Sequence, residues 1–186
     1  MFSKLVIFLL LLSNFSYAQS QEKLDTYISN SIKTIIEKHD YTIDKVFYVD
    51  FSIPANQPRF FVINLIYRKV LAKGYCASGK TNDSGVVIFS NLEGSNCSSK
   101  GAYKIGKSYI GKYGKSYILY GLDSTNSNAY DRNIVIHPYS NLEKKESFRF
   151  VPVTEGCVGV TDSFLNQLSS YIDKSVIPIL LIIDSN

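Results

Sequence analysis

The chain has 186 residues, with 20 Lys and Arg, 16 Asp and Glu and a formal net charge of +4. This mild charge favours an acidic partner such as a cell-wall polymer or an anionic surface, but it does not establish one. Two histidines, with no CxxC and no HxxxH pair, argue against a metal site. Fourteen Tyr, eleven Phe and no Trp, together with many Ile and Val, indicate a β-rich fold.

Residues 1–18 have the features of a secretory signal peptide. Lys4 supplies the positive start, residues 5–12 form an apolar run, and Ser16 and Ala18 place small residues where a signal peptidase reads the chain. The run is too short to span a bilayer. We therefore expect a protein exported to the periplasm or cell envelope, with one domain that has a substantial core.

A helix and several strands are predicted next. Residues 22–38 repeat apolar side chains at helical spacing and predict a helix that packs on a sheet, within an N-terminal segment of residues 19–45. Runs of apolar and aromatic residues predict strands at residues 46–52, 60–66, 70–76 and 86–89.

The stretch from Gly94 to Leu122 contains five lysines, five tyrosines and no acidic residue. Its frequent glycines predict short strands and tight turns. Basic and aromatic residues also line single-stranded nucleic-acid grooves, but a solvated sheet face is the interpretation that we prefer, and no nucleic-acid partner is expected. Residues 101–108 match the phosphate-binding pattern GxxxxGKS without a buried strand before them or a good helix after them, so we expect no nucleotide.

His137 and Cys157 are the candidate catalytic residues. Residues 134–136 predict a strand that ends on His137, whereas His39, the other histidine, lies in a polar run. A thiol with its free pKa of about 8.5 is a poor nucleophile, so a catalytic cysteine needs a nearby base or positive charge. The sequence predicts that both side chains meet at the edge of a β-sheet. The alternative is a small buried cysteine and a hydrogen-bonded core histidine.

The end of the chain predicts one helix and one strand. Thr161 can cap a helix over residues 162–173, and residues 177–183 predict a strand. The apolar run at residues 176–183 contains Pro178 and is too short to span a membrane, so no transmembrane segment is expected in the mature chain.

Three cysteines in an exported protein leave at least one thiol without a partner in the same chain. Cys76 and Cys97 could form a disulfide and leave Cys157 free. Three buried, reduced cysteines are the alternative, because pairing cannot be read from the sequence.

Several short segments resemble, in their order along the chain, the exported cysteine enzymes called L,D-transpeptidases. They are Phe89-Ser90-Asn91, Gly94-Ser95, residues 98–103, 111–116, 119–123, 126–129 and 132–137, and Gly156-Cys157. The closest resemblance is to the branch known as murein L,D-transpeptidase catalytic domain-like, and it is best over residues 47–183.

The resemblance implies a fold and a reaction. The fold is mainly β, a sandwich or barrel-like catalytic domain over residues 46–186, with an N-terminal helix and a helix after the catalytic cysteine. Cys157 would attack a peptidoglycan stem peptide, release D-alanine and form an acyl-thioester that an amine resolves. His137 would accept the thiol proton and later deprotonate the amine. No metal or cofactor is implied.

The resemblance also implies roles for neighbouring residues. The carbonyl of Pro138 would orient the imidazole, and the backbone amides of Glu155, Gly156 and Cys157 are candidates for an oxyanion hole. The candidate substrate-binding residues are Arg132, Thr154 and Tyr120; a structural ion pair is the alternative for Arg132.

The chain departs from the better-known branch of the family at two positions. That branch has a histidine before the Gly-Cys and an arginine two residues after the cysteine, where this chain has Glu155 and Gly159. The lost arginine removes a charge that would help the thiolate and bind a substrate carboxylate. A non-catalytic cell-wall binding module on the same fold, and an L,D-carboxypeptidase or another cysteine amidase, are the alternative functions.

Overall fold

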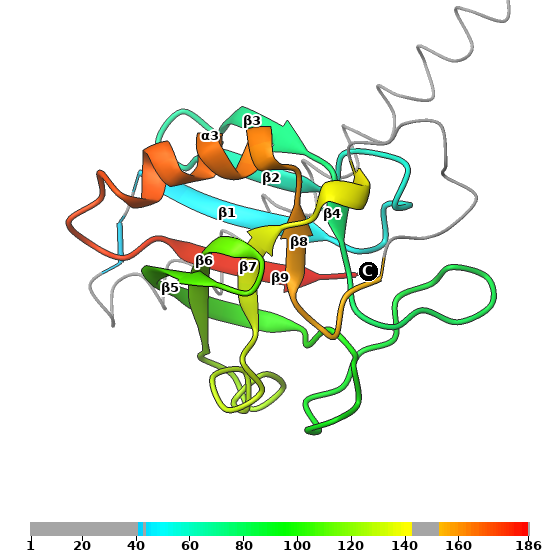
Figure 1. The fold of residues 1–186 in the computed structure, drawn as a ribbon. Helices are drawn as coiled ribbons and strands as arrows, with labels where there is room; N and C mark the ends of the chain where they lie inside the picture. The colour runs from blue at the N-terminus through cyan, green and yellow to red at the C-terminus, as the bar shows by residue number, and fades with distance from the viewer. Residues whose placement is uncertain (1–40, 43, 143–152, 186) are drawn as a thin grey trace, which may run out of the picture. The chain divides into compact units, whose positions relative to one another are not determined.

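The computed structural model describes residues 41–42, 44–142 and 153–185 (Figure 1). The expected signal peptide and the expected helix at residues 22–38 lie outside these residues. The described part contains nine strands, one α-helix and one 3-10 helix. Their bounds are β1 Lys45–Asp50, β2 Phe60–Asn64, β3 Lys69–Gly74, β4 Cys76–Ala77, β5 Gly101–Gly111, β6 Gly114–Gly121, β7 Val135–Pro138, η2 Ser140–Leu142, β8 Val158–Val160, α3 Asp162–Ile172 and β9 Leu180–Asp184.

All nine strands belong to one sheet, in the order β3-β2-β1-β9-β5-β6-β7-β8-β4. β3 and β4 lie at opposite ends of this order, yet Tyr75 is the one residue between them in the sequence. Because one residue spans less than about 4 Å, the end of β3 must lie next to the start of β4, so the two end strands of the sheet meet at this point. The sheet is therefore curled in the manner of a barrel, which confirms the predicted mainly β fold class.

Most of the predicted strands are confirmed. The predictions at residues 46–52, 60–66, 70–76, 134–136 and 177–183 correspond to β1, β2, β3, β7 and β9. The prediction of a strand at residues 86–89 is wrong. Val87 and Phe89 form isolated bridges with Thr81 and Ser98, on two different partners, so no continuous ladder forms.

The glycine-rich stretch forms the hairpin of β5 and β6. Gly111 pairs with Gly114 across a two-residue turn, Lys112-Tyr113, and Gly114 adopts a φ of +87° that favours glycine. Residues 101–108 lie within β5, so the GxxxxGKS match is an extended strand and has neither the loop nor the helix of a phosphate-binding site.

The helix after Cys157 is confirmed as α3, which lies across the strands β1–β3 (Figure 1). The Thr161 hydroxyl caps it by accepting a hydrogen bond from the Phe164 amide at 3.2 Å. Phe164 is buried with its ring edge-on to Phe60 at 5.4 Å, and Leu168 is fully buried. Burying each such side chain contributes about 1.5–3 kcal/mol, which anchors the chain just after β8.

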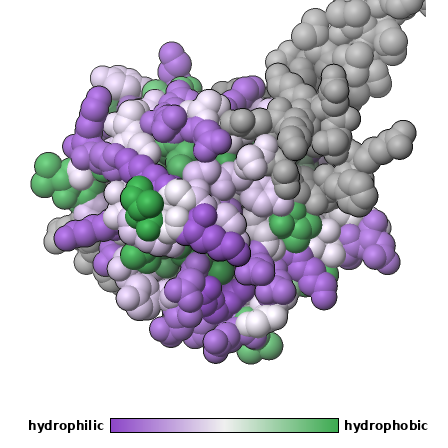
Figure 2. All heavy atoms as spheres, viewed as in Figure 1, coloured by the Kyte–Doolittle hydropathy of each residue, from purple (hydrophilic) through white to green (hydrophobic). Residues whose placement is uncertain are grey.

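The surface drawn in Figure 2 is mostly hydrophilic, with hydrophobic residues in small, separate groups. Among the residues described, no helix has the length and apolar character that crossing a membrane requires.

Candidate active site

His137 lies in β7 and is the candidate base of the site. Its side chain is buried, and Nδ1 lies 2.7 Å from the carbonyl oxygen of Pro138. A carbonyl can only accept, so Nδ1 carries the proton and Nε2 keeps its lone pair. Burial lowers the pKa of His137, and the bond to Pro138 opposes this by raising it. The imidazole is therefore neutral near pH 7 and can accept a proton at Nε2.

Tyr113 stacks on the imidazole and is a site residue that the sequence did not single out. Its ring lies 4.5 Å from the ring of His137, centroid to centroid, at an interplanar angle of 25°. Tyr113 comes from the turn between β5 and β6, far from His137 in the sequence. Only the pairing of β6 with β7 brings the two together.

Cys157 immediately precedes β8, which runs parallel to β7. Val158 pairs with Ile136 and Gly159 with His137, so Cys157 lies level with Val135, two residues before His137 along the neighbouring strand. The Cys157 side chain is half-buried, and its thiol donates a weak hydrogen bond to the Asn133 carbonyl at 3.6 Å.

Cys157 and His137 line one cavity of about 590 Å³. Its lining residues are Lys80, Gly94, Ser95, Asn96, Tyr113, His137, Tyr139, Val153, Thr154, Glu155 and Cys157. The structure thus brings the predicted nucleophile and base to the same cavity, together with Thr154 and Glu155 from the predicted set.

Thr154 holds the turn that carries the cysteine. Its hydroxyl donates to the Cys157 carbonyl at 2.7 Å and accepts from the Gly156 amide at 3.2 Å. Its own amide donates to the Ser78 carbonyl at 2.7 Å. The Gly156 amide is therefore occupied within the turn, whereas the described residues provide no hydrogen-bond partner for the amides of Glu155 and Cys157.

Gly156 has a φ of +111°, a conformation that side chains other than glycine rarely adopt. A Cβ at this position would lie 2.7 Å from the Cys97 carbonyl oxygen and 3.0 Å from both Arg132 Nη2 and Ile134 Cδ1. The residue before Cys157 must therefore be glycine for the turn to keep its shape.

Arg132 lies behind this turn and is not among the residues that line the cavity. Its guanidinium donates to the carbonyls of Ser90 at 2.9 Å and Cys97 at 2.6 Å, and to the hydroxyls of Ser99 at 2.8 Å and Ser95 at 3.4 Å. These bonds fix the loop at residues 90–99, which forms one wall of the cavity. No carboxylate within the described residues pairs with this guanidinium.

The other segments of the resemblance support the same loop. Asn91 donates to the Ser124 carbonyl at 3.1 Å and accepts from the Asn128 amide at 3.1 Å. Asn128 in turn donates through its side chain to the Asn91 carbonyl at 3.0 Å. These polar residues therefore hold loops together and do not face the cavity.

Burial raises the pKa of the Cys157 thiol. A hydrogen bond from the Val135 backbone lowers it, the Glu155 carboxylate raises it, and the positive charge of Arg132 lowers it. With a raised thiol pKa and a lowered imidazole pKa, the resting pair consists of a neutral thiol and a neutral imidazole.

Removing the charge of Glu155 should therefore make Cys157 more reactive. Because the carboxylate raises the pKa of the thiol, Glu155→Gln should lower that pKa and shift the pH profile of thiol labelling to more acidic pH. The rate of labelling by iodoacetamide, measured from pH 6 to pH 10, checks this. The control is Glu93→Gln, a change at an exposed residue outside the cavity. Identical pH profiles for Glu155→Gln and the unmodified protein would contradict the predicted shift.

Tyr120 lies in a different part of the molecule from the cavity. Its ring stacks on Tyr130 at 5.1 Å, and Lys104 Nζ lies 4.7 Å from its centroid. It lines a separate cavity of about 790 Å³ together with residues of β5, β6 and the segment 172–179.

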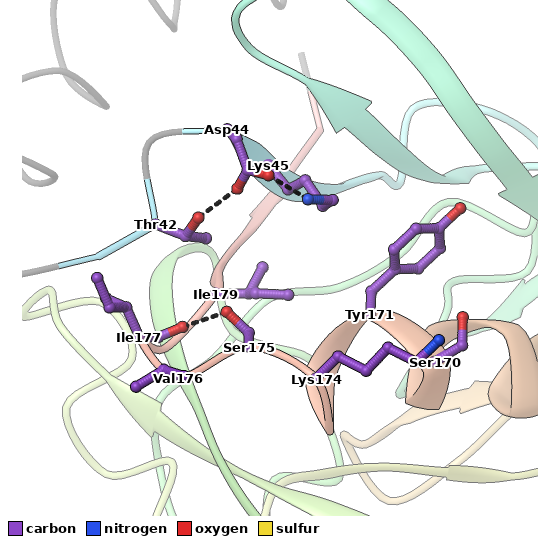
Figure 3. Close-up of a pocket in the computed structure, with 10 residues that line it drawn as sticks. All are labelled: Thr42, Asp44, Lys45, Ser170, Tyr171, Lys174, Ser175, Val176, Ile177 and Ile179. Atoms are coloured by element: carbon purple, nitrogen blue, oxygen red, sulfur yellow. Dashed lines mark hydrogen bonds and ion pairs between the residues drawn. The ribbon is translucent and has the colours of Figure 1, made fainter.

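Another cavity, of about 560 Å³, lies between the start of β1 and the end of α3 (Figure 3). Its carboxylate, Asp44, already accepts from Thr42 and pairs with Lys45. The residues drawn include no cysteine or histidine, so this hollow lacks a nucleophile with a base.

All three cysteines are free thiols, so the possible Cys76–Cys97 disulfide is not formed. Cys76 is fully buried, which raises the pKa of its thiol to about 12, and Cys97 is buried as well. Cys157 is therefore the most accessible thiol. Within the part of the chain that the structure describes, no group of three or more His, Cys, Asp or Glu could hold a metal ion.

Comparison with solved structures gives distant matches. An L,D-transpeptidase from Xylanimonas cellulosilytica is 13% identical, with a TM-score of 0.48 over 77% of this chain and 61% of that one. An L,D-transpeptidase from Mycobacterium smegmatis is 12% identical, with a TM-score of 0.44 over 76% and 58%. The helical cell shape determining protein Pgp2 from Campylobacter jejuni is 14% identical, with a TM-score of 0.49 over 87% and 55%.

The chain thus spans 55–61% of the length of these three proteins. A comparison with curated proteins finds no match. The model of the L,D-transpeptidase catalytic domain, in contrast, matches residues 17–180, which is most of the chain. The chain therefore belongs to the L,D-transpeptidase catalytic domain family.

Proposed function

We propose that this protein is an exported cysteine acyltransferase that cross-links peptidoglycan stem peptides in the periplasm or cell envelope. The observation that carries the proposal is the tautomer of His137, fixed by Pro138, in a cavity that it shares with the accessible thiol of Cys157. Family membership supplies the class of reaction, and the signal-peptide features of residues 1–18 support export.

The first half of the reaction forms an acyl-thioester. Nε2 of His137 accepts the proton of the Cys157 thiol as the sulfur attacks the carbonyl carbon before D-alanine. The negative charge on the carbonyl oxygen is stabilised by backbone N–H groups, for which the amides of Glu155 and Cys157 are the candidates. His137 then gives the proton to the nitrogen of D-alanine, which leaves as a free amino acid.

The second half transfers the acyl group. The amine of a second stem peptide attacks the thioester, His137 accepts the proton of that amine, and the sulfur leaves and takes up the proton. Because the resting imidazole is neutral, it is ready to act as a base in both halves without prior deprotonation.

Two other functions fit the same cavity. Water in place of the amine would give an L,D-carboxypeptidase. A binding module would hold the stem peptide without turnover, and the raised pKa of Cys157 is the observation that favours it.

The experiment is incubation of the protein with a disaccharide tetrapeptide ending in D-alanine, followed by mass spectrometry of the protein and the products. We expect release of D-alanine, an acyl adduct on Cys157 and a cross-linked dimer. A trimmed tripeptide alone would indicate the carboxypeptidase. Binding without release of D-alanine and without acylation by a carbapenem would contradict an enzymatic role.

A further inference from the structure

The active-site cavity contains two side chains of opposite formal charge. Lys80 and Glu155 both line it, and both are exposed to solvent. Within the described residues, neither the Lys80 ammonium nor the Glu155 carboxylate has a hydrogen bond or an ion pair, although both belong to the same cavity. Among the described residues, these two charges therefore have no partner, and they line the same cavity as the thiol.

The backbone holds both residues at the same rim of the cavity. Ser78 forms a parallel bridge with Val153, and Lys80 and Glu155 each lie two residues further along their segments. The amide of Lys80 donates to the Asn96 carbonyl, and its carbonyl accepts from the Ile88 amide, each at 2.9 Å. Because the backbone of Lys80 is hydrogen-bonded, the cost of ordering Lys80 around a ligand is confined to its side chain.

Position 159, where the better-known branch that this chain resembles has an arginine, cannot supply a positive charge here. Gly159 is buried, and a Cβ at this position would lie 3.0 Å from the Tyr139 Cβ and 3.2 Å from the Ala77 Cβ. The guanidinium of Arg132 is engaged with the loop at residues 90–99. Lys80 is therefore the cation that remains available among the residues lining the cavity.

The leaving group and the acceptor of the proposed reaction share one chemical shape. D-alanine leaves as an amine with a carboxylate on the adjacent carbon, and an acceptor of the same shape would occupy the same position in the second half of the reaction. A cation and an anion at one rim fit such a zwitterion, because each can pair with the opposite charge.

We infer that Lys80 and Glu155 form the subsite for the leaving group and the acceptor: Lys80 binds the carboxylate next to the reacting nitrogen, and Glu155 attracts the ammonium. This inference rests on the proposed function. It makes Lys80 and Glu155 the residues that select a leaving group and an acceptor with a carboxylate next to the nitrogen. The acceptor ammonium loses one proton to solvent before it attacks as a neutral amine; His137 then accepts the second proton and passes it to the sulfur as the sulfur leaves, so the covalent steps are unchanged.

The Lys80 half is tested with two donors, a tetrapeptide ending in D-alanine and the same peptide ending in D-alaninamide. The unmodified protein should prefer the carboxylate by about tenfold in kcat/KM, the value of one charge-assisted contact of about 1.4 kcal/mol. Lys80→Met should bring the ratio close to one through KM, and Lys80→Arg should keep the preference. Lys69→Met, an exposed lysine of β3, is the control and should leave the ratio unchanged.

The Glu155 half is tested with free D-alanine as the acceptor. Glu155→Gln should lower the ratio of transfer to hydrolysis several-fold, because water carries no charge that Glu155 could attract. This ratio is insensitive to the higher reactivity of the thiol expected for the same variant. An unchanged ratio would overturn the role of Glu155, and Glu93→Gln is the control.

A binding measurement separates this inference from the proposed function. Calorimetry with Cys157→Ala should show tighter binding of the carboxylate donor than of the carboxamide, and Lys80→Met in the same background should remove the difference. If this difference in binding is found but the unmodified protein shows no turnover, the proposed enzymatic function is overturned and the subsite for the carboxylate is supported. Equal binding of both donors would overturn the subsite.

Discussion

Substituting Cys157 by Ala should abolish the release of D-alanine, and His137→Ala should slow it by about 10²–10⁴-fold, the usual contribution of a general base. The sulfur of Cys157 is the atom that forms the thioester in the proposed reaction, so without it the acyl-enzyme intermediate cannot form. The imidazole matters because burial raises the pKa of Cys157 and keeps the thiol protonated without a base. D-alanine released per minute, with intact-protein mass spectra, measures both effects.

The control for this prediction is labelling of the other two thiols. Cys76 and Cys97 are buried, so iodoacetamide should modify the folded protein once, and Cys157→Ala should not be modified. Circular dichroism should show both variants folded. Release of D-alanine by Cys157→Ala at the normal rate would rule out the thioester.

Gly156→Ala is expected to have the second largest effect. Backbone strain at a φ of +111° costs about 1–3 kcal/mol, and the added Cβ would also overlap the Cys97 carbonyl oxygen at 2.7 Å. The turn must then move, and Cys157 and the backbone amides beside it move with it. We expect a lower free energy of unfolding in urea and at least a tenfold slower release of D-alanine, since small displacements of catalytic groups are costly.

Gly94→Ala is a matched control for the strain alone. Gly94 also has a positive φ, of +71°, but a Cβ there would meet no atom within 4 Å. It should lose stability through strain and keep an unshifted Cys157 that labels at the normal rate. Because Gly94 itself lines the cavity, the comparison uses labelling of Cys157 and not activity, and an equal loss of labelling in both variants would show that the contact behind Gly156 has no special role.

The strands and the helix after Cys157 could be predicted because their signals are local. Thr161 and the apolar spacing of the next eleven residues define α3, and runs of aromatic and β-branched residues define β1, β2 and β9. Val87 and Phe89 look the same in sequence, but they bridge to different partners and form no strand. Which partner a segment meets is decided by the whole sheet, and the sequence around it does not contain that information.

The candidate site could be predicted only in part for the same reason. His137 and Cys157 stand out because the chain contains few histidines and cysteines. Tyr113 is one of fourteen tyrosines, and nothing in its neighbours shows that β6 will place it on the imidazole. Arg132 is a candidate for substrate binding by resemblance, with a structural ion pair as the alternative, and its hydrogen bonds go to the loop behind the cysteine.

The meeting of β3 and β4 at Tyr75 affects the tendency of this protein to aggregate. These are the two end strands of the sheet, and an exposed end strand is a template for polymerisation with another chain. β4 is two residues long and fully buried, and β3 carries the exposed lysines Lys69 and Lys73. The chain is rich in aromatic and β-branched residues, but one edge strand of its sheet is short and the other carries charges. Both features discourage fibrous aggregation.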